Sequence, residues 1–244
     1  MNAKLLERMT SYRDKQGVFC SKKILSKKIK YQFQIIGQLK SSNNFIQNII
    51  DSRDVQELLL IEARAARAYW HIFGKRIVQK VSWNGRGAHA GDVANKLLDI
   101  GYHYLANKLL TICQEINLPT ELGFFHKAQS ANTHPLVYDC MEWLRPIVVD
   151  SVLLKMIGKK KKKIETIHQK FIPVFISKIK HKFERDYFHR KLGYCVALEY
   201  WTKLVLLELM DCINTNKKYN PIFPSLRNET RCSCNKKPPA KQTV

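Results

Sequence analysis

The sequence has few of the residues that interrupt helices. Its 244 residues include only 10 Gly and 8 Pro, and runs in which apolar and polar residues alternate are scarce. Apolar side chains instead recur at helical spacing along most of the chain, which is typical of amphipathic helices. Because turn residues and strict alternation mark β-rich proteins, their scarcity predicts an all-α fold.

Two further absences exclude other classes of protein. No stretch approaches the ~18 uncharged apolar residues that a membrane-spanning helix needs, and the first residues contain no apolar run of secretory length. The seven cysteines are scattered and include no Cys-x-x-Cys pair. We therefore expect reduced thiols in a protein that does not span a membrane, without a disulfide framework or a zinc site.

Acidic residues are also scarce relative to basic ones. The chain has 42 Lys and Arg against 20 Asp and Glu, for a formal net charge of +22. A compact domain with this charge repels itself unless a polyanion neutralises it. Nucleic acid is therefore the first expected partner and an anionic membrane surface the second. For any single lysine a solvated surface position is the simpler interpretation, so only the total excess favours DNA.

The helical pattern predicts one lobe of about seven or eight helices. We expect basic N-terminal helices over 1–53, a continuous catalytic lobe over 54–213 and a polar, basic, flexible tail over 214–244. The clearest helices are expected over residues 21–39, 54–73, 92–115, 135–157, 164–182 and 190–213. Asp92 is expected to cap its helix, and Pro173 to break or kink the helix that contains it.

One carboxylate lies on an apolar stripe. In the helix expected over 54–73, Glu62 follows Leu58 and Leu59 and precedes Ala65 on the face expected to meet the core. An unsatisfied carboxylate there costs several kcal/mol. Either an ion pair with Arg64 or Arg67, or a bound metal, would satisfy it. This helix alone favours the ion pair.

A second acidic cluster follows a turn. His126 ends the turn 123–126, and Asp139 and Glu142 are three residues apart, on one face of the helix expected over 135–157. Two carboxylates and one imidazole, from Glu62, His126 and Glu142, suit Mg²⁺ or Mn²⁺ and metal-assisted chemistry on a phosphodiester. A solvated face paired with lysines is the alternative, and spacing alone leaves open whether the three residues meet.

Five sequence blocks form a recognisable series, beginning with residues 59–70 (LLIEARAARAYW) and residues 92–102 (DVANKLLDIGY). In this order they resemble blocks of the CRISPR-associated integrase of the spacer-acquisition module, the Cas1 family, whose first two helices read E-G-x-A-A-R-x-Y-W and D-x-x-N-x-L-L-N-Y-G-Y. The remaining blocks are 123–126 (GFFH, for G-F-L-H), 136–146 (LVYDCMEWLRP, for L-x-x-D-x-M-E-x-F-R-P) and the close 219–221 (YNP). The likeness covers about residues 15–225, and ordered blocks are more specific than any one motif.

The resemblance implies roles for particular residues. A divalent Mg²⁺ or Mn²⁺ is expected on Glu62, His126 and Glu142, which would be catalytic, with Asp139 as a supporting acid. Arg67 and Arg145 are expected to form structural pairs. The candidates for DNA contact are Arg64, Arg86, Trp83, Lys159, Lys160 and Lys161.

The resemblance also implies an activity and partners. It indicates a metal-dependent DNA endonuclease and integrase of CRISPR adaptation, which joins short DNA 3′-hydroxyl ends to a repeat by transesterification in the prokaryotic cytoplasm. The expected partners are DNA (spacer precursor and CRISPR repeat), a second copy of the chain and a small ferredoxin-like adaptation protein, with no membrane.

The family also has a β-rich domain before its helical lobe, and nothing before Asp54 is typical of a sheet, so we expect the helical lobe only. The alternative is therefore a truncated or inactive, non-catalytic helical DNA-binding module. A membrane-surface protein is the least favoured, because the basic residues do not lie opposite one aromatic face.

Overall fold

Helices make up most of the chain, which confirms the expected all-α class. The computed structural model describes residues 3–87, 91–128, 130, 133–159, 163–167 and 171–226. The α-helices in these residues are α1 (Ala3–Ile35), α2 (Ser42–Asp51), α3 (Val55–Ile77), α4 (Val93–Glu115), α5 (Pro135–Met141), α6 (Ser151–Gly158), α7 (Phe171–Phe183) and α8 (Leu198–Thr215). A 3₁₀ turn η1 (Leu39–Ser41), a π-helix η2 (Arg145–Asp150) and two strands, β1 (Asp186–His189) and β2 (Tyr194–Ala197), complete the elements.

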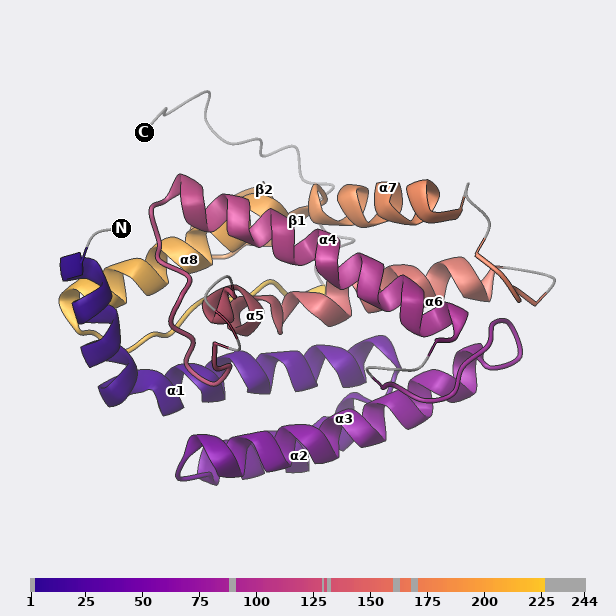
Figure 1. Ribbon diagram of the computed structural model, residues 1–244, viewed down its shortest axis with the longest axis horizontal. Coiled ribbons are helices and arrows are strands. Elements are labelled where there is room, and N and C mark those ends of the chain that lie inside the picture. The colour runs from indigo at the N-terminus through magenta and orange to yellow at the C-terminus, as the bar shows by residue number, and fades with distance from the viewer. Residues whose placement is uncertain are drawn as a thin grey trace.

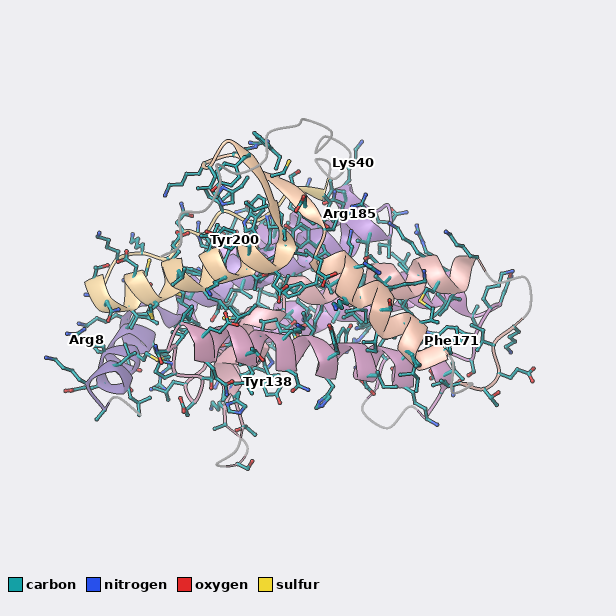
Figure 2. The ribbon with its side chains drawn as sticks, turned by 90° about the horizontal axis from the view of Figure 1, so that it is seen from above. Arg8, Lys40, Tyr138, Phe171, Arg185 and Tyr200 are labelled. Carbon is teal, nitrogen blue, oxygen red and sulfur yellow. The ribbon has the colours of Figure 1, made fainter. Side chains whose placement is uncertain are left out.

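The helices are arranged around a central segment. Helices α1, α2 and α3 lie on one side, and α4, α7 and α8 lie on the other (Figure 1). The segment α5–η2–α6 runs between them and contacts α1 and α3 as well as α4 and α7. Seen from above, α8 and α7 follow one another along α4 (Figure 2). The central segment is therefore enclosed from both sides, and five of the six residues of η2 are buried.

Helix α1 is longer than the sequence predicts. We expected a helix over 21–39, whereas α1 begins at Ala3 and ends at Ile35. Its first half buries little more than Met9 and Tyr12, so its apolar periodicity is weak. The chain reverses at Gly37, whose φ of +67° suits a residue without a β-carbon.

Aspartate side chains cap the first turns of α3 and α4. The carboxylate of Asp54 accepts a hydrogen bond from the backbone N–H of Glu57 at 2.8 Å. The carboxylate of Asp92 accepts one from Asn95 at 2.9 Å, which confirms Asp92 as the N-cap of α4. Each bond satisfies a donor that the first turn leaves unpaired, so both helices have defined starts.

The expected helix over 135–157 is not one continuous α-helix. It consists of α5, a turn, the π-helix η2 and α6. Pro146 lies in η2 and has no N–H to give to a regular α-helical ladder. A wider turn accommodates this local loss, and apolar periodicity does not reveal it.

Two expectations for the C-terminal third are wrong. The backbone is helical without interruption over Phe171–Phe183, so Pro173 does not break α7. The helix expected from residue 190 begins only at Leu198, because residues 186–197 form an antiparallel hairpin in which Tyr187 pairs with Val196. Gly193, with φ +76°, lies between its strands.

The thiols differ from the expectation at one position. Cys195, in β2, is disulfide-bonded, whereas Cys20, Cys113, Cys140 and Cys212 are free and buried. None of the helices in the described ranges is both long and apolar enough to cross a membrane.

The described part of the expected flexible tail is packed. The indole N–H of Trp201 donates to the carbonyl oxygen of Ile222 at 2.7 Å, and the hydroxyl of Tyr31 donates to that of Pro224. Tyr219 is buried as well. Residues 217–226 therefore lie against α1 and α8, although they include two prolines and belong to the segment expected to be flexible.

A close helix crossing gives the first prediction. A β-carbon on Gly101 of α4 would lie 2.5 Å from Val149 Cγ1 and 3.1 Å from Ile179 Cδ1, and both side chains are buried. Gly101→Ala should therefore lower the free energy of unfolding by about 1–3 kcal/mol in urea titrations, because neither neighbour can move freely. Gly158→Ala is the control, since among the described residues no atom beyond its chain neighbours and its own helix backbone lies within 4 Å of the added carbon. A Gly101→Ala variant as stable as the wild type would contradict this packing.

Candidate metal and nucleic-acid site

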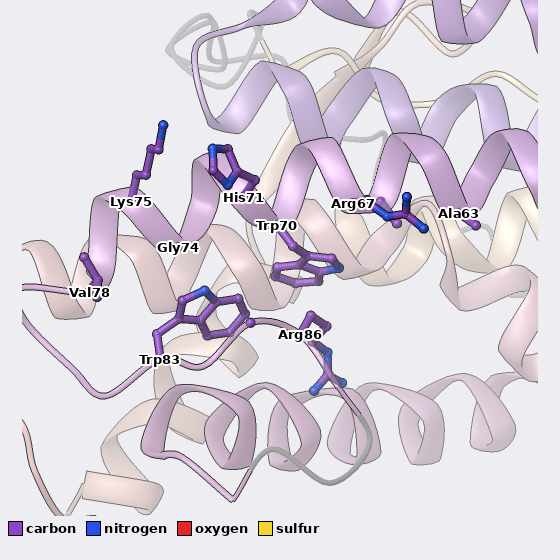
Figure 3. Close-up of a pocket in the computed structure, with 11 residues that line it drawn as sticks. Ala63, Arg67, Trp70, His71, Gly74, Lys75, Val78, Trp83 and Arg86 are labelled. Atoms are coloured by element: carbon purple, nitrogen blue, oxygen red, sulfur yellow. The ribbon is translucent and has the colours of Figure 1, made fainter.

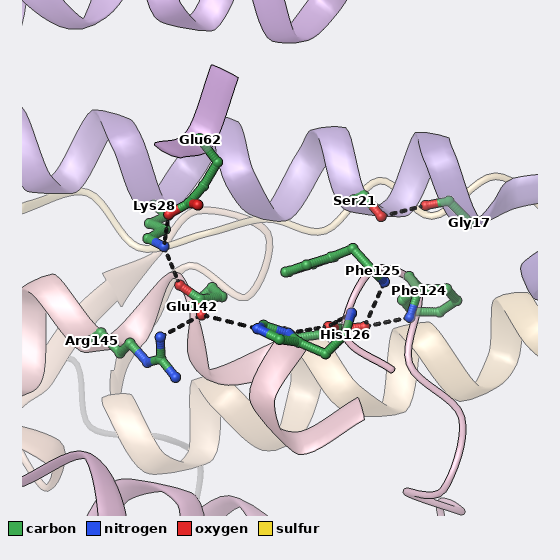
Figure 4. Close-up of polar contacts among 10 residues, drawn as sticks. Gly17, Ser21, Lys28, Glu62, Phe124, Phe125, His126, Glu142 and Arg145 are labelled. Atoms are coloured by element: carbon green, nitrogen blue, oxygen red, sulfur yellow. Dashed lines mark hydrogen bonds and ion pairs between the residues drawn. The ribbon is translucent and has the colours of Figure 1, made fainter. Parts of the chain in front are cut away.

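Two acids and a lysine meet between three elements (Figure 4). Helix α3 carries Glu62, the end of α5 carries Glu142, and α1 carries Lys28. The ammonium of Lys28 lies 2.6 Å from Glu62 Oε1 and 2.6 Å from Glu142 Oε2. The side chain of Glu142 is only 3% exposed, compared with 21% for Glu62. Of the two carboxylates, that of Glu142 is therefore the more strongly desolvated.

The other oxygen of Glu142 also faces positive charge. Arg145 Nη1 lies 2.6 Å from Glu142 Oε1, and His126 Nε2 lies 3.9 Å from it. Burial alone would raise the pKa of Glu142, but Arg145, Lys28 and His126 together lower that pKa to about 2. Burial would likewise lower the pKa of Lys28, but Glu142 and Glu62 raise it. The acid and the lysine are therefore both charged at neutral pH.

Asp139 organises the turn that carries His126. Its carboxylate, which is fully buried, accepts backbone N–H bonds from Phe124, from Phe125 at 3.3 Å and from His126 at 3.0 Å. Its Oδ1 also lies 2.6 Å from His126 Nδ1. Gly123 allows this approach, since a β-carbon there would lie 2.5 Å from the carbonyl oxygen of His126. With Nδ1 bonded to Asp139, the imidazole presents Nε2 to Glu142.

The predicted ligands are thus brought together, but around a lysine. Glu62 and Glu142 share Lys28, and His126 is adjacent to Glu142. Within the described ranges, no three His, Cys, Asp or Glu side chains are arranged to hold a metal ion as they stand. Metal binding by Glu62, His126 and Glu142 stays a prediction, as does the supporting role of Asp139.

Sequence reasoning missed Lys28 as the partner of Glu62. It proposed an ion pair with Arg64 or Arg67 from the same helix, whereas the pair is formed with α1. The available signal was the position of Lys28, four residues after Ile24 on a stripe that is buried in α1. A basic residue on such a stripe needs an anion, by the same reasoning that singled out Glu62.

A groove of ≈ 790 Å³ lies along the exposed side of α3 and the loop after it (Figure 3). The rings of Trp70 and Trp83 are 5.8 Å apart at an angle of 39°, and the guanidinium of Arg86 lies 5.9 Å from the centre of Trp70. Its basic and aromatic lining consists of Arg67, Trp70, His71, Lys75, Trp83 and Arg86. The groove combines positive charge with aromatic faces, as single-stranded nucleic acid requires.

The groove is lined by three of the residues singled out from the sequence, which are Arg67, Trp83 and Arg86. Trp83 is half-buried and closes over Gly74, while Arg86 is held by Asn95 at 2.8 Å and by Asp99 at 2.5 Å. Arg67 is exposed in the groove, and no ion pair with an acid of the described ranges is recorded for it, so its structural pairing stays a prediction.

The other basic candidates lie in different surroundings. Arg145 is paired with Glu142, as expected. Arg64 and Lys159 are exposed, and Lys160 and Lys161 lie outside the described residues.

The family described as "CRISPR associated protein Cas1" matches residues 2–182. The chain belongs to this family. Its curated relatives include a CRISPR-associated endonuclease Cas1 of Francisella tularensis subsp. novicida, 26% identical over 75% of this chain and 62% of the relative. They also include one of Archaeoglobus fulgidus, 27% identical over 65% of this chain and 55% of the relative. The chain therefore spans a little over half the length of these Cas1 relatives.

Solved structures share the fold of this Cas1 chain. A casposase bound to its integration product aligns with a TM-score of 0.77, 19% identity and coverage of 92% of this chain and 73% of that one. A Cas1 protein from Thermotoga maritima aligns with a TM-score of 0.72, 18% identity and coverage of 86% and 70%.

Behind the acidic cluster of this Cas1 chain lies a buried tyrosine–aspartate network. Asp150, at the end of η2, accepts hydrogen bonds from Tyr69 at 2.8 Å and Tyr102 at 2.6 Å. The guanidinium of Arg145 lies 5.0 Å from the centre of the Tyr102 ring. Burial raises the pKa of Asp150 to about 6, although the tyrosine hydroxyls and Arg145 oppose the rise. The network therefore connects α3 and α4 to the residue that holds Glu142.

The raised pKa of Asp150 predicts a pH dependence of stability. The folded chain binds this proton more tightly than the unfolded chain, so its contribution to stability is present below about pH 4 and is lost as pH rises to about 6. Relative to Asp150→Asn, the wild type should lose about 2 kcal/mol of unfolding free energy between pH 4 and pH 6.5. Urea titrations at several pH values measure this difference. Asp51→Asn, at an exposed position, should show no such trend, and a constant difference for Asp150→Asn would contradict the assignment.

Proposed function

We propose that this chain is the helical catalytic lobe of a metal-dependent DNA endonuclease and integrase of CRISPR adaptation. It would join DNA 3′-hydroxyl ends to a repeat by transesterification. The observation that supports this most directly is the convergence of Glu62, Glu142 and His126 from distant parts of the chain. The Cas1 relatives that carry the name endonuclease give the reaction class.

The donor set fits a divalent ion such as Mg²⁺ or Mn²⁺. Two carboxylates with one imidazole match the oxygen preference of these ions. Glu142 Oε2 is buried and has no partner with hydrogen-bond geometry, although Lys28 lies 2.6 Å away. His126 uses Nδ1 towards Asp139, so Nε2 is the nitrogen left for a metal. The residues that would hold the ion are Glu62, His126 and Glu142.

The remaining residues hold and orient the reacting groups. When bound, the ion supplies charge stabilisation for the phosphate and for the oxygens that attack and leave. Asp139 fixes the tautomer and the direction of His126, and Arg145 fixes Glu142. The groove on α3 provides a path for the DNA, whose phosphates the basic side chains bind without reading its sequence.

DNA and further protein chains are the proposed partners. The casposase neighbour is bound to an integration product, and another neighbour, with a TM-score of 0.75, is part of a Cas6-RT-Cas1–Cas2 complex. We extend both to this chain as spacer-precursor DNA, a CRISPR repeat, a second copy of the chain and a small ferredoxin-like adaptation protein. The charge of +22 supports the nucleic-acid part of this proposal.

One observation favours a second candidate, a non-catalytic helical DNA-binding module. Lys28 occupies a position between Glu62 and Glu142 at hydrogen-bond distance from both. If this ion pair is permanent, the acids serve the fold and the basic groove alone acts on DNA. The two candidates differ in metal-dependent strand joining.

Substitution of the two carboxylates and the imidazole tests the proposed enzymatic activity. Glu62→Ala, His126→Ala and Glu142→Gln should each lower Mn²⁺-dependent joining of a 3′-hydroxyl oligonucleotide to a repeat duplex by more than about 100-fold. Loss of a residue that only hydrogen-bonds to a metal ligand lowers the activity of a metal site by ~10–100-fold. Loss of a proposed ligand itself should therefore have a larger effect. DNA affinity, measured by fluorescence anisotropy, should change little.

Glu121→Ala is the matched control, because Glu121 is an exposed acid outside the cluster. Full activity in all three variants would contradict the metal site. A wild type that binds DNA but never joins or cuts it in Mn²⁺ would favour the non-catalytic module.

Salt dependence tests the groove. The logarithm of the DNA affinity should fall linearly with the logarithm of salt concentration, with a slope of about −0.9 per neutralised phosphate. Arg67→Gln and Lys75→Gln, on the groove wall, should each reduce the steepness by about 0.9 if each contacts one phosphate. Lys4→Gln, at the exposed start of α1, should leave the slope unchanged. Equal slopes for all variants would place the DNA elsewhere on the chain.

A further inference from the structure

Lys28 is placed where a cation that binds both acids has to lie. Its ammonium is 2.6 Å from one oxygen of Glu62 and 2.6 Å from one oxygen of Glu142. Its side chain is only 9% exposed, and among the described residues the two carboxylates are the groups to which its ammonium bonds (Figure 4). A buried lysine with two acidic partners at this distance is a strong, charge-assisted contact.

Both oxygens of Glu142 are already taken by cations. Arg145 Nη1 lies 2.6 Å from Oε1, and Lys28 Nζ lies 2.6 Å from Oε2. Two cations thus balance the two carboxylates of Glu62 and Glu142. A divalent ion added to this set would place four positive charges against two negative ones within a few ångströms, so one of the resident cations has to leave.

Lys28 is the cation that can leave. Arg145 is three residues from Glu142 on the same segment, and its guanidinium lies over the ring of Tyr102 at 5.0 Å. Lys28 comes from another helix, and its ammonium sits on a flexible four-carbon stem that can rotate outward. Its removal would free the Glu142 oxygen that lacks a partner with hydrogen-bond geometry.

We infer that Lys28 is an internal counter-ion that a divalent metal displaces from Glu62 and Glu142, so that this lysine limits the metal affinity of the site. This inference rests on the proposed function, because it takes Glu62 and Glu142 as metal ligands. Lys28 is a positioning residue in this scheme: it keeps two like charges together until the metal replaces it.

Direct binding of Mn²⁺ to the full chain tests this exchange. Isothermal titration calorimetry, or the electron paramagnetic resonance signal of free Mn²⁺, gives the dissociation constant without any DNA. Lys28→Met keeps an unbranched chain and removes the charge, so Mn²⁺ should bind at least about tenfold more tightly than to the wild type. Lys28→Gln, a polar variant, should bind more tightly as well. Lys30→Met removes the same charge from an exposed position of α1 and should leave the affinity within about twofold.

Thermal unfolding provides a second readout. In EDTA, Lys28→Met should unfold at a lower temperature than the wild type, because Glu62 and Glu142 then lie together without their shared cation. Saturating Mn²⁺ should raise its melting temperature by more than it raises that of the wild type. If Lys28→Gln folds but neither Lys28 variant binds Mn²⁺ more tightly than the wild type does, the exchange is overturned. An absence of Mn²⁺ binding to all variants overturns it too.

The strand-joining assay separates this inference from the proposed function. A wild type that joins DNA in Mn²⁺, together with unchanged Mn²⁺ affinity in Lys28→Met, would overturn the exchange and leave the integrase intact. Tighter Mn²⁺ binding by Lys28→Met in a chain that never joins DNA would support the exchange and overturn the catalytic proposal.

Discussion

The carboxylate of Glu142 is the group on which the candidate site depends. It is buried at the centre of the lobe, and each of its oxygens faces a cation from a different part of the chain. Because a buried carboxylate without partners is strongly unfavourable, Glu142 requires α1 and the start of η2 to be in place around it. Lys28 extends this requirement to Glu62, and so α3 is joined to the same point. The acidic cluster is thus also a junction of three helical segments.

Asp139 stabilises the loop that carries His126, as Glu142 stabilises the junction of the helices. Three consecutive backbone N–H groups of the turn that ends at His126 point at its carboxylate. The same carboxylate holds the imidazole through Nδ1, so the loop backbone and the ring are fixed by one side chain. The elements that carry His126 and Glu142 are thus connected by the protein's own contacts, without metal or DNA. Preorganisation of this kind is what a phosphoryl-transfer site needs, because most of its catalysis comes from placement and charge.

The sequence predicted the parts of this structure that have local signals. The cap at Asp92 and the long apolar stripes of α3 and α4 have such signals, and the bounds of both helices were predicted to within a few residues. Glu62 was recognisable because a carboxylate on an apolar stripe needs a partner. The identity of that partner was not recognisable, because Lys28 is one of several lysines in a basic segment and nothing local distinguishes it from the others. Its pairing with Glu62 depends on how α1 crosses α3.

Other features depend on tertiary contacts in the same way. The hairpin at 186–197 and the packed segment 217–226 are stabilised by neighbours distant in sequence, such as Tyr31 for Pro224.

The metal assignment came from the family resemblance together with residue chemistry. The family membership is established, and the metal remains a proposal.

The π-helix η2 has a consequence for how this lobe can vary. Its wider turn brings residues five apart to one side, so that Arg145 lies over the ring of Tyr102 while Asp150 accepts a bond from the hydroxyl of the same tyrosine. Deleting a single residue from η2 would leave a regular i→i+4 turn and remove the five-residue spacing that brings Arg145 and Asp150 to the same tyrosine. Insertions and deletions should therefore be tolerated in the loops around this segment but not within its six residues, whose length is set by the tyrosine that both ends touch.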